Sequence, residues 1–115
     1  MVVLWGRELI QIYNAGYREL MGDKHPRGMG QPTSECWPEV WHINEPIYAR
    51  VRQGETLTFE DSLYPVKRQG HLKDAYFTLC YSALRDEAAD ISGILVTVFE
   101  TTERVLAEMG LSDLP

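Results

Sequence analysis

The chain has 115 residues, enough for one domain and too few for two, because domains typically run to roughly 100–150 residues. Hydrophobic residues make up 44% of it and charged residues 24%, the balance of an ordinary globular protein. The net charge of −6 argues against nucleic acid as a partner, since a protein that binds phosphates presents a basic surface.

Targeting and redox features are few. No apolar stretch approaches the roughly 18 residues that span a membrane, so we expect no membrane contact by this segment. No basic segment precedes the apolar residues Val2–Trp5, which argues against a secretory signal. Cys36 and Cys80 lie far apart and form no Cys-x-x-Cys motif, which favours reduced thiols and a cytoplasmic location.

The start of the chain predicts two short strands, a helix and a loop. Val2–Trp5 and residues 9–13 are apolar runs that contain β-branched residues, as strands do. Asn14 is a favourable residue for capping a helix N-terminus, so we expect a helix over residues 15–21. Residues 23–33 are rich in Gly and Pro and predict a loop.

The next segment has a helical period that prolines interrupt. Apolar residues recur over Val40–Val51 at a spacing close to that of a helix. Pro38 and Pro46 fall in this region, and proline is tolerated in a first helical turn but disrupts an interior one. We therefore expect two consecutive helices, the second beginning near Asn44–Pro46 and ending at Gly54.

The second half of the chain changes to the two-residue period of strands. Four segments predict strands: 56–59, 63–66, 75–82 and 92–99. The last of them is apolar on both faces, as expected of a strand at the centre of a sheet. A final helix is expected over residues 105–109, with Thr101 or Thr102 as its cap.

These elements together predict an α+β domain. Short connections between the last three strands indicate an antiparallel sheet, with about five strands in all. The helices must cover one face of this sheet, because the chain offers nothing else to bury it.

An ordered set of short motifs runs from Val2 to about Glu108. The motifs are Ile12–Gly22, Gly30–Pro32, Val51–Glu55, Arg68–Gly70, Tyr81–Glu87 and Glu100–Arg104, together with Gly22–Pro26 and Trp37–Trp41. In this order they resemble a PAS domain. The most similar subgroup is the PAS modules of bacterial sensor histidine kinases and related multi-domain signalling proteins.

Two positions depart from the family's pattern. Ala83 stands where Pro usually follows a Tyr-Ser step, and the hairpin at Ala88–Ile91 lacks the customary Gly. Both concern the turn between the last two strands, so they bear on that loop rather than on the fold.

The resemblance implies a PAS fold with sheet order 2-1-5-4-3 and a small cavity under the helices, with a signal leaving through the C-terminal helix. It assigns residues 1–108 to a sensory domain and residues 109–115 to the start of a linker toward an effector, which we expect to be a histidine kinase. On this interpretation the chain is a fragment of a larger signalling protein or a module that works by docking. The domain itself is expected to have no catalytic residues and no enzymatic activity.

Three sets of residues are candidates for functional sites. Those for the ligand cavity are Tyr17, Trp37, Trp41, His42, Tyr48, Phe77, Leu79, Tyr81, Val96 and Val98. Those for signal relay are Glu100, Thr101, Thr102 and Arg104. A third set shares the outer face of the sheet and is too apolar to face water comfortably, which predicts a homodimer or a partner contact there: Tyr76, Thr78, Cys80, Leu95, Thr97 and Phe99.

The sequence argues against the cofactors that some PAS domains hold. LOV-type domains carry Gly-x-Asn-Cys where this chain has Gly30–Thr33, and apolar Phe77 and Val98 replace the polar contacts to a flavin. Haem requires an axial ligand, for which His42 is the only candidate, and an exposed helix histidine is the simpler interpretation. A metal site would need three or four clustered ligands, and none is evident.

Two alternatives stay open. One is a small pocket enzyme of the ketosteroid-isomerase type, in which Tyr17 and Tyr81 would serve, although no carboxylate is expected at an inward-facing strand position. The other is a PAS module that binds no ligand and acts only as a dimerisation adaptor. The sequence identifies no ligand.

Overall fold

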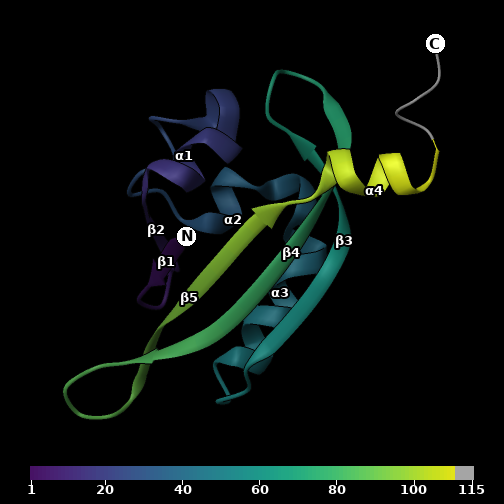
Figure 1. The fold of residues 1–115 in the computed structure, drawn as a ribbon. Coiled ribbons are helices and arrows are strands. Elements are labelled where there is room, and N and C mark those ends of the chain that lie inside the picture. Colours follow the sequence, from purple (N-terminus) through teal and green to yellow (C-terminus); the bar gives the residue numbers. More distant parts are fainter. Residues whose placement is uncertain (111–115) are drawn as a thin grey trace.

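Five strands form one antiparallel sheet in the order β2-β1-β5-β4-β3, as a computed structural model that describes residues 1–110 shows. The strands are β1 (Val2–Trp5), β2 (Ile10–Tyr13), β3 (Leu57–Lys67), β4 (Leu72–Arg85) and β5 (Ile91–Glu100). The predicted fold class and strand order are confirmed. Because β5 lies between β1 and β4, it joins the N-terminal pair β1–β2 and the pair β3–β4 into one sheet (Figure 1).

Short helices connect the first two strands to the last three. They are α1 (Ala15–Met21), α2 (Thr33–Cys36) and α3 (Trp41–Val51), with the 3-10 turns η1 (Gly22–Lys24) and η2 (Pro38–Val40) beside them. A last helix, α4 (Thr102–Glu108), follows β5 and extends away from the sheet (Figure 1).

Side-chain alternation along β4 decides which face of the sheet is buried. Phe77, Leu79 and Tyr81 are 7%, 7% and 1% exposed, whereas Thr78 and Cys80 between them are half-buried. The buried row packs against the helices, and Tyr48 of α3 lies with its ring centroid 6.0 Å from that of Tyr81. The core therefore sits between this inner face and the helices.

The first helix begins where the sequence predicts. The backbone N–H of Tyr17 donates to Oδ1 of Asn14 at 3.0 Å, which satisfies one of the unpaired amides of the first turn. The predicted helix over residues 15–21 is confirmed, and Tyr17 and Met21 are its buried residues.

The two helices expected on either side of Pro46 are instead a single helix, α3. Pro46 lies inside it, where its ring removes only one backbone donor. That loss leaves the carbonyl of His42 without its helical partner, and both His42 and Pro46 are on the exposed side of the helix, where the carbonyl is open to solvent. The helix ends at Val51 and not at Gly54, because a turn follows it.

The two strand segments expected at 56–59 and 63–66 belong to one strand, β3. The pairing of β3 with β4 shifts between Phe59 and Ser62, which is a β-bulge. Asp61 within it has a φ of +50°, and its N–H donates to the Thr78 hydroxyl at 3.2 Å. The polar residues that resemble a loop in the sequence are therefore the bulge of a continuous strand.

The residue expected to cap the last helix is in place, but its side-chain hydrogen bond is absent. Thr101 occupies the N-cap position of α4, but its side chain forms no capping hydrogen bond. The Thr102 hydroxyl instead accepts from the backbone N–H of Tyr76 at 2.9 Å, so it ties the helix to β4. The helix begins at Thr102 and ends at Glu108, earlier than the 105–109 expected.

Two expectations about the chain's ends have a limited test. Within residues 1–110, no helix is both long and apolar enough to cross a membrane. Most of the linker expected over 109–115 lies outside the described residues.

Candidate ligand cavity

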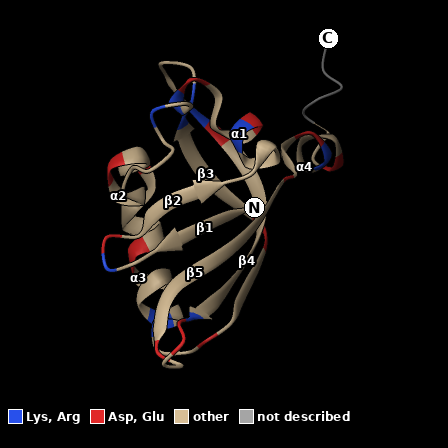
Figure 2. Ribbon diagram, turned by 90° about the vertical axis from the view of Figure 1, so that its left-hand side faces the viewer, with Lys and Arg blue, Asp and Glu red and all other residues tan. Residues whose placement is uncertain are grey.

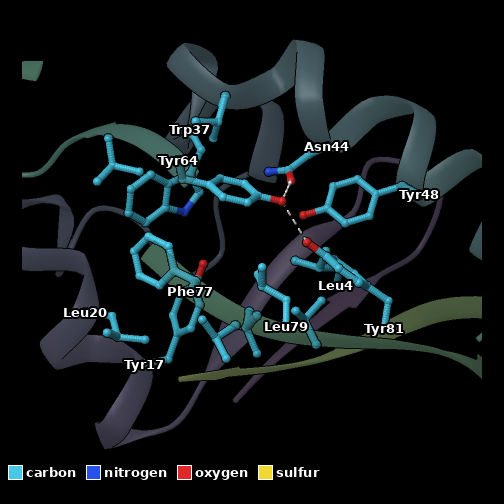
Figure 3. A pocket seen from close by; sticks show the side chains of 15 residues that line it. Leu4, Tyr17, Leu20, Trp37, Asn44, Tyr48, Tyr64, Phe77, Leu79 and Tyr81 are labelled. Atoms are coloured by element: carbon cyan, nitrogen blue, oxygen red, sulfur yellow. Dashed lines mark hydrogen bonds between the residues drawn. The ribbon is translucent and has the colours of Figure 1, made fainter. Parts of the chain in front are cut away.

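A small cavity of about 60 Å³ lies between the inner face of the sheet and the helices. Aliphatic and aromatic side chains make most of its wall, and they come from β1, α1, η2, α3 and the last three strands. The lining residues are Val2, Leu4, Tyr17, Leu20, Trp37, Val40, Asn44, Tyr48, Tyr64, Val66, Phe77, Leu79, Tyr81, Val96 and Val98 (Figure 3). The cavity is therefore enclosed by elements from both halves of the chain.

A short hydrogen-bonded chain crosses one side of this cavity. The Tyr64 hydroxyl donates to Oδ1 of Asn44 at 3.0 Å and lies 3.1 Å from the Tyr81 hydroxyl (Figure 3). A phenol has one hydrogen, and that of Tyr64 is directed at Asn44, so Tyr81 is the donor to Tyr64. The chain satisfies three polar side chains in a site that is otherwise apolar, which is the condition for burying them.

The phenols of the wall are neutral. Burial raises the pKa of Tyr17, Tyr48 and Tyr81 above the ordinary range of tyrosine, because a phenolate would lose its hydration there. Burial raises the pKa of Tyr64 in the same way. Each hydroxyl therefore keeps its hydrogen at neutral pH, and the lining carries no charge, since it contains no Asp, Glu, Lys, Arg or His.

A model of the PAS fold family matches residues 7–106 of the chain. The chain belongs to this family. No curated protein matches it closely enough to count as a relative. The resemblance proposed from the ordered motifs is thus confirmed, and the family gives this PAS domain a general role as a sensory or interaction module.

Eight of the ten residues predicted for the cavity of the PAS domain line it. The other two lie elsewhere on α3. Trp41 is half-buried and packs on Tyr48 from outside, with ring centroids 6.0 Å apart, and His42 is exposed. Both were expected on the helical period alone, which does not tell the inner side of a helix from its flank. Contact of the eight lining residues with a ligand stays a prediction.

Neither haem nor a flavin adduct fits the residues present. The exposed side chain of His42 is not part of the cavity wall, so it cannot ligate an iron held there. Cys36 is 4% exposed and is absent from the lining, and burial raises the pKa of its thiol. Within residues 1–110 no three His, Cys, Asp or Glu side chains come close enough together to hold a metal ion.

Sequence reasoning missed the most polar part of the wall. The sequence pattern places Asn44 near a helix start and Tyr64 in a separate short strand. Two signals were present: Asn44 lies one helical turn before Tyr48, and Tyr64 alternates with the buried Val66. The remaining lining residues that it missed are Val2, Leu4, Leu20, Val40 and Val66.

One side chain connects the wall of the PAS cavity to the start of α4. The guanidinium of Arg68 lies 5.8 Å from the ring centroid of Phe77 and donates to the carbonyl of Leu20 at 3.2 Å. It also holds Glu100 through two hydrogen bonds of 2.7 and 3.1 Å. Phe77 and Leu20 line the cavity, and Glu100 is the last residue of β5.

The four residues predicted for signal relay gather around this connection. Glu100 accepts from the Thr102 hydroxyl at 2.9 Å, and the N–H of Thr101 donates to the carbonyl of Tyr76 at 2.8 Å. Arg104 pairs with Asp61 in the bulge of β3 and with Glu108 one turn along the helix. The first turn of α4 is therefore fastened to β3, β4 and β5, and the relay role itself stays a prediction.

The outer face of the sheet carries apolar residues on β1, β2, β4 and β5. The six residues predicted for a dimer contact are half-buried or exposed, with Phe99 64% exposed. The register extends the face to β1 and β2, where Val3 pairs with Leu95 and Ile12, and Trp5 pairs with Ile10. Figure 2 shows β1, β2 and most of β5 without charged residues. The sequence did not indicate this extension.

Proposed function

We propose that this PAS domain is the sensory module of a cytoplasmic signal-transduction protein. A small ligand in the cavity is the signal, and α4 is the output. The effector is a histidine kinase joined beyond the chain's end, in line with the resemblance to the PAS modules of such kinases. The domain has no enzymatic activity of its own.

The position of Arg68 carries this proposal. A ligand that changes the packing of Phe77 or Leu20 acts on the guanidinium that touches both. The same guanidinium holds Glu100, one residue before the N-cap of α4. Packed side chains and ion pairs of this kind can carry energetic coupling between two sites when both sites bias the same element.

The isomerase-like alternative finds less support. General acid–base catalysis on a bound substrate requires a titratable group within hydrogen-bond reach of it. The lining residues include no carboxylate, and the phenols have pKa values that burial raises far from neutrality. We therefore retain a binding role for the cavity.

A second role, self-association through the outer face of the sheet, rests on a separate observation. Trp5, Ile12 and Phe99 are 41%, 54% and 64% exposed on one side of the sheet. Contiguous apolar surface of this kind marks interaction sites. In the proposed protein, this face pairs two copies of the domain, which places the two α4 helices in one assembly.

The relay is tested with a change in the cavity that needs no ligand. Val40→Ile adds one methyl group to the cavity wall at η2. In the uniformly ¹⁵N-labelled chain we expect this substitution to shift the amide resonances of Thr102–Glu108. In an Arg68→Gln background, those shifts should fall by half or more.

The matched control is Arg50→Gln, because Arg50 and Glu55 form an equivalent two-bond pair, 2.9 and 3.1 Å, that does not touch the cavity. Val40→Ile should shift α4 as strongly in this background as in the wild type. Equal shifts in the Arg68→Gln and Arg50→Gln backgrounds would contradict the role given to Arg68.

A further inference from the structure

The hydrogen bonds among Tyr81, Tyr64 and Asn44 leave one donor of the cavity wall without a partner. Nε1 of Trp37 is buried and forms no hydrogen bond within residues 1–110. Trp37 as a whole is 8% exposed. An indole N–H can only donate. A buried donor without a partner costs free energy, so this atom indicates a missing acceptor.

The Tyr17 hydroxyl faces the same place from α1. It points toward the indole of Trp37 (Figure 3). Burial raises the pKa of Tyr17 and a hydrogen bond from the Trp37 side chain opposes that rise, so the Tyr17 oxygen lies near Nε1, although the two atoms do not reach the geometry of a full hydrogen bond. A single acceptor atom between them would receive a hydrogen from each.

Two acceptors of the wall are already occupied. Oδ1 of Asn44 receives the Tyr64 hydrogen, and the Tyr64 oxygen receives that of Tyr81. Asn44 supplies the only side-chain carbonyl among the residues that line the cavity. The hydroxyl oxygens of Tyr17, Tyr48 and Tyr81 can still accept a hydrogen, whereas the Trp37 N–H can only donate and has no partner. It is therefore the Trp37 N–H that selects for an acceptor on the guest.

Charged guests are disfavoured. The nearest cations lie behind the aromatic wall and are already paired: Lys24, 4.8 Å from the Trp37 ring centroid, with Glu39, and Arg68 with Glu100. Neither cation is a lining residue. An ion taken into a site without a counter-ion loses several kcal/mol of hydration, as a rough guide.

Space limits the size of the guest. One water molecule needs a cavity volume of about 10–15 Å³. The volume of this cavity is about 60 Å³. That is room for a few waters or for one compact organic molecule.

We propose that the cavity binds a compact, uncharged, mostly apolar molecule that carries one carbonyl-type acceptor, with the acceptor against Trp37 Nε1–H and the Tyr17 hydroxyl. Its apolar body lies against Leu4, Leu79 and Val96. This inference rests on the proposed function in one respect, since it names the chemical class of the signal that the cavity senses.

The test compares four small molecules of matched size by ¹H–¹⁵N NMR titration of the chain at neutral pH. They are cyclopentanone, cyclopentane, cyclopentylammonium and cyclopropanecarboxylate. Cyclopentanone should shift the amides of Tyr48, Leu79 and Val96 in a saturable way. Cyclopentane should bind about three- to tenfold more weakly, the effect of one hydrogen bond. The two ions should produce no saturable shift.

Two variants test the donors. Trp37→Phe keeps an aromatic ring and removes the N–H, and Tyr17→Phe removes the hydroxyl. Each should weaken the binding of cyclopentanone about three- to tenfold and leave the binding of cyclopentane unchanged. Trp41→Phe, outside the cavity, is the matched control and should change neither. The dispersion of the amide spectrum reports whether each variant is folded. If Trp37→Phe does not fold, Tyr17→Phe alone tests the donors.

The outcomes separate this inference from the proposed function. Tighter binding of either ion than of cyclopentanone overturns the ligand class and leaves cavity sensing in place. Saturable shifts in the cavity without any at α4 overturn the relay and support the ligand class. A failure of all four to bind, with the cavity holding water only, overturns the ligand class.

Discussion

Arg68 and Glu100 form a two-bond ion pair, 2.7 and 3.1 Å, that joins the turn after β3 to the last residue of β5. Their side chains are 21% and 29% exposed, so the pair is only partly screened by solvent. The two residues lie in different hairpins, and the pair fixes where β5 ends and α4 begins. It is the point at which the cavity, the sheet and the last helix meet.

This pair predicts a dependence of stability on pH. Arg68 lowers the pKa of Glu100 below its ordinary value of 4.5, against the opposing effect of burial. The folded state therefore favours the carboxylate, and its contribution is present above pH 4.5 and lost as the pH falls below it. At pH 7, Glu100→Gln should lower the free energy of unfolding by about 0.5–1 kcal/mol, the range of a partly exposed pair.

Urea denaturation at several pH values provides the measurement. The difference between wild type and Glu100→Gln should shrink toward zero as the pH falls from 5 toward about 3. Glu55→Gln, which breaks the exposed pair with Arg50, should have a smaller effect at pH 7. A difference for Glu100→Gln that stays constant over this pH range would contradict the assignment of the effect to the carboxylate.

Removal of the central hydroxyl from the cavity's hydrogen-bonded chain should destabilise the fold. Tyr64→Phe leaves Oδ1 of Asn44 without its donor and the Tyr81 hydroxyl without its acceptor. Such buried groups cost about 1–3 kcal/mol when a partner is removed, and chemical denaturation measures the loss. Tyr76→Phe removes a hydroxyl from the outer face as the control. Equal losses in the two variants would show that the buried chain contributes nothing.

The hairpin between β4 and β5 holds one residue in a strained backbone conformation that a substitution can relieve. Ala89 has a φ of +66°, in the region that glycine adopts without steric cost. The turn is held by Asp86, whose Oδ1 accepts from the N–H groups of Ala88 and Asp90. This is the hairpin in which the family's customary Gly is missing, and the structure places an alanine in the conformation that a Gly would take.

Ala89→Gly should therefore raise the free energy of unfolding by about 0.5–1 kcal/mol, because the relief of steric strain exceeds the added entropy of the unfolded chain. Ala88→Gly, one residue earlier and not in this conformation, should be neutral or destabilising. The midpoints of thermal unfolding of the two variants compare them directly. A lower midpoint for Ala89→Gly than for wild type would contradict the prediction.

Local patterns predicted the elements whose side-chain period is regular. The alternation along β4 placed Phe77, Leu79 and Tyr81 on the inner face, and Asn14 marked the start of α1. The same reasoning failed at Asp61 and Pro46, because a bulge depends on contacts with a neighbouring strand and an interior proline depends on which side of the helix is exposed. For Asp61 that contact is the Thr78 hydroxyl on the neighbouring strand.

The cavity shows the same limit. A helical period identifies an apolar stripe, but it does not show which of its residues faces the sheet. In the structure Tyr48 faces the sheet, Trp41 lies at the flank of α3, and His42 is exposed. The pairing of Tyr64 with Asn44 joins residues 20 positions apart in the chain. Arg68 was assigned to a turn, since nothing in its neighbours indicates Glu100, 32 positions away.

The apolar outer face predicts self-association that a single charge should weaken. Phe99 is 64% exposed and pairs with Thr78 on this face, so Phe99→Arg would place an unpaired cation in any contact there. We expect sedimentation equilibrium to show a dimer for wild type and at least tenfold weaker association for the variant. Met29→Arg puts the same charge on an exposed apolar side chain of the loop after η1 and should not affect association. A wild-type chain that stays monomeric at millimolar concentration would contradict the role of this face.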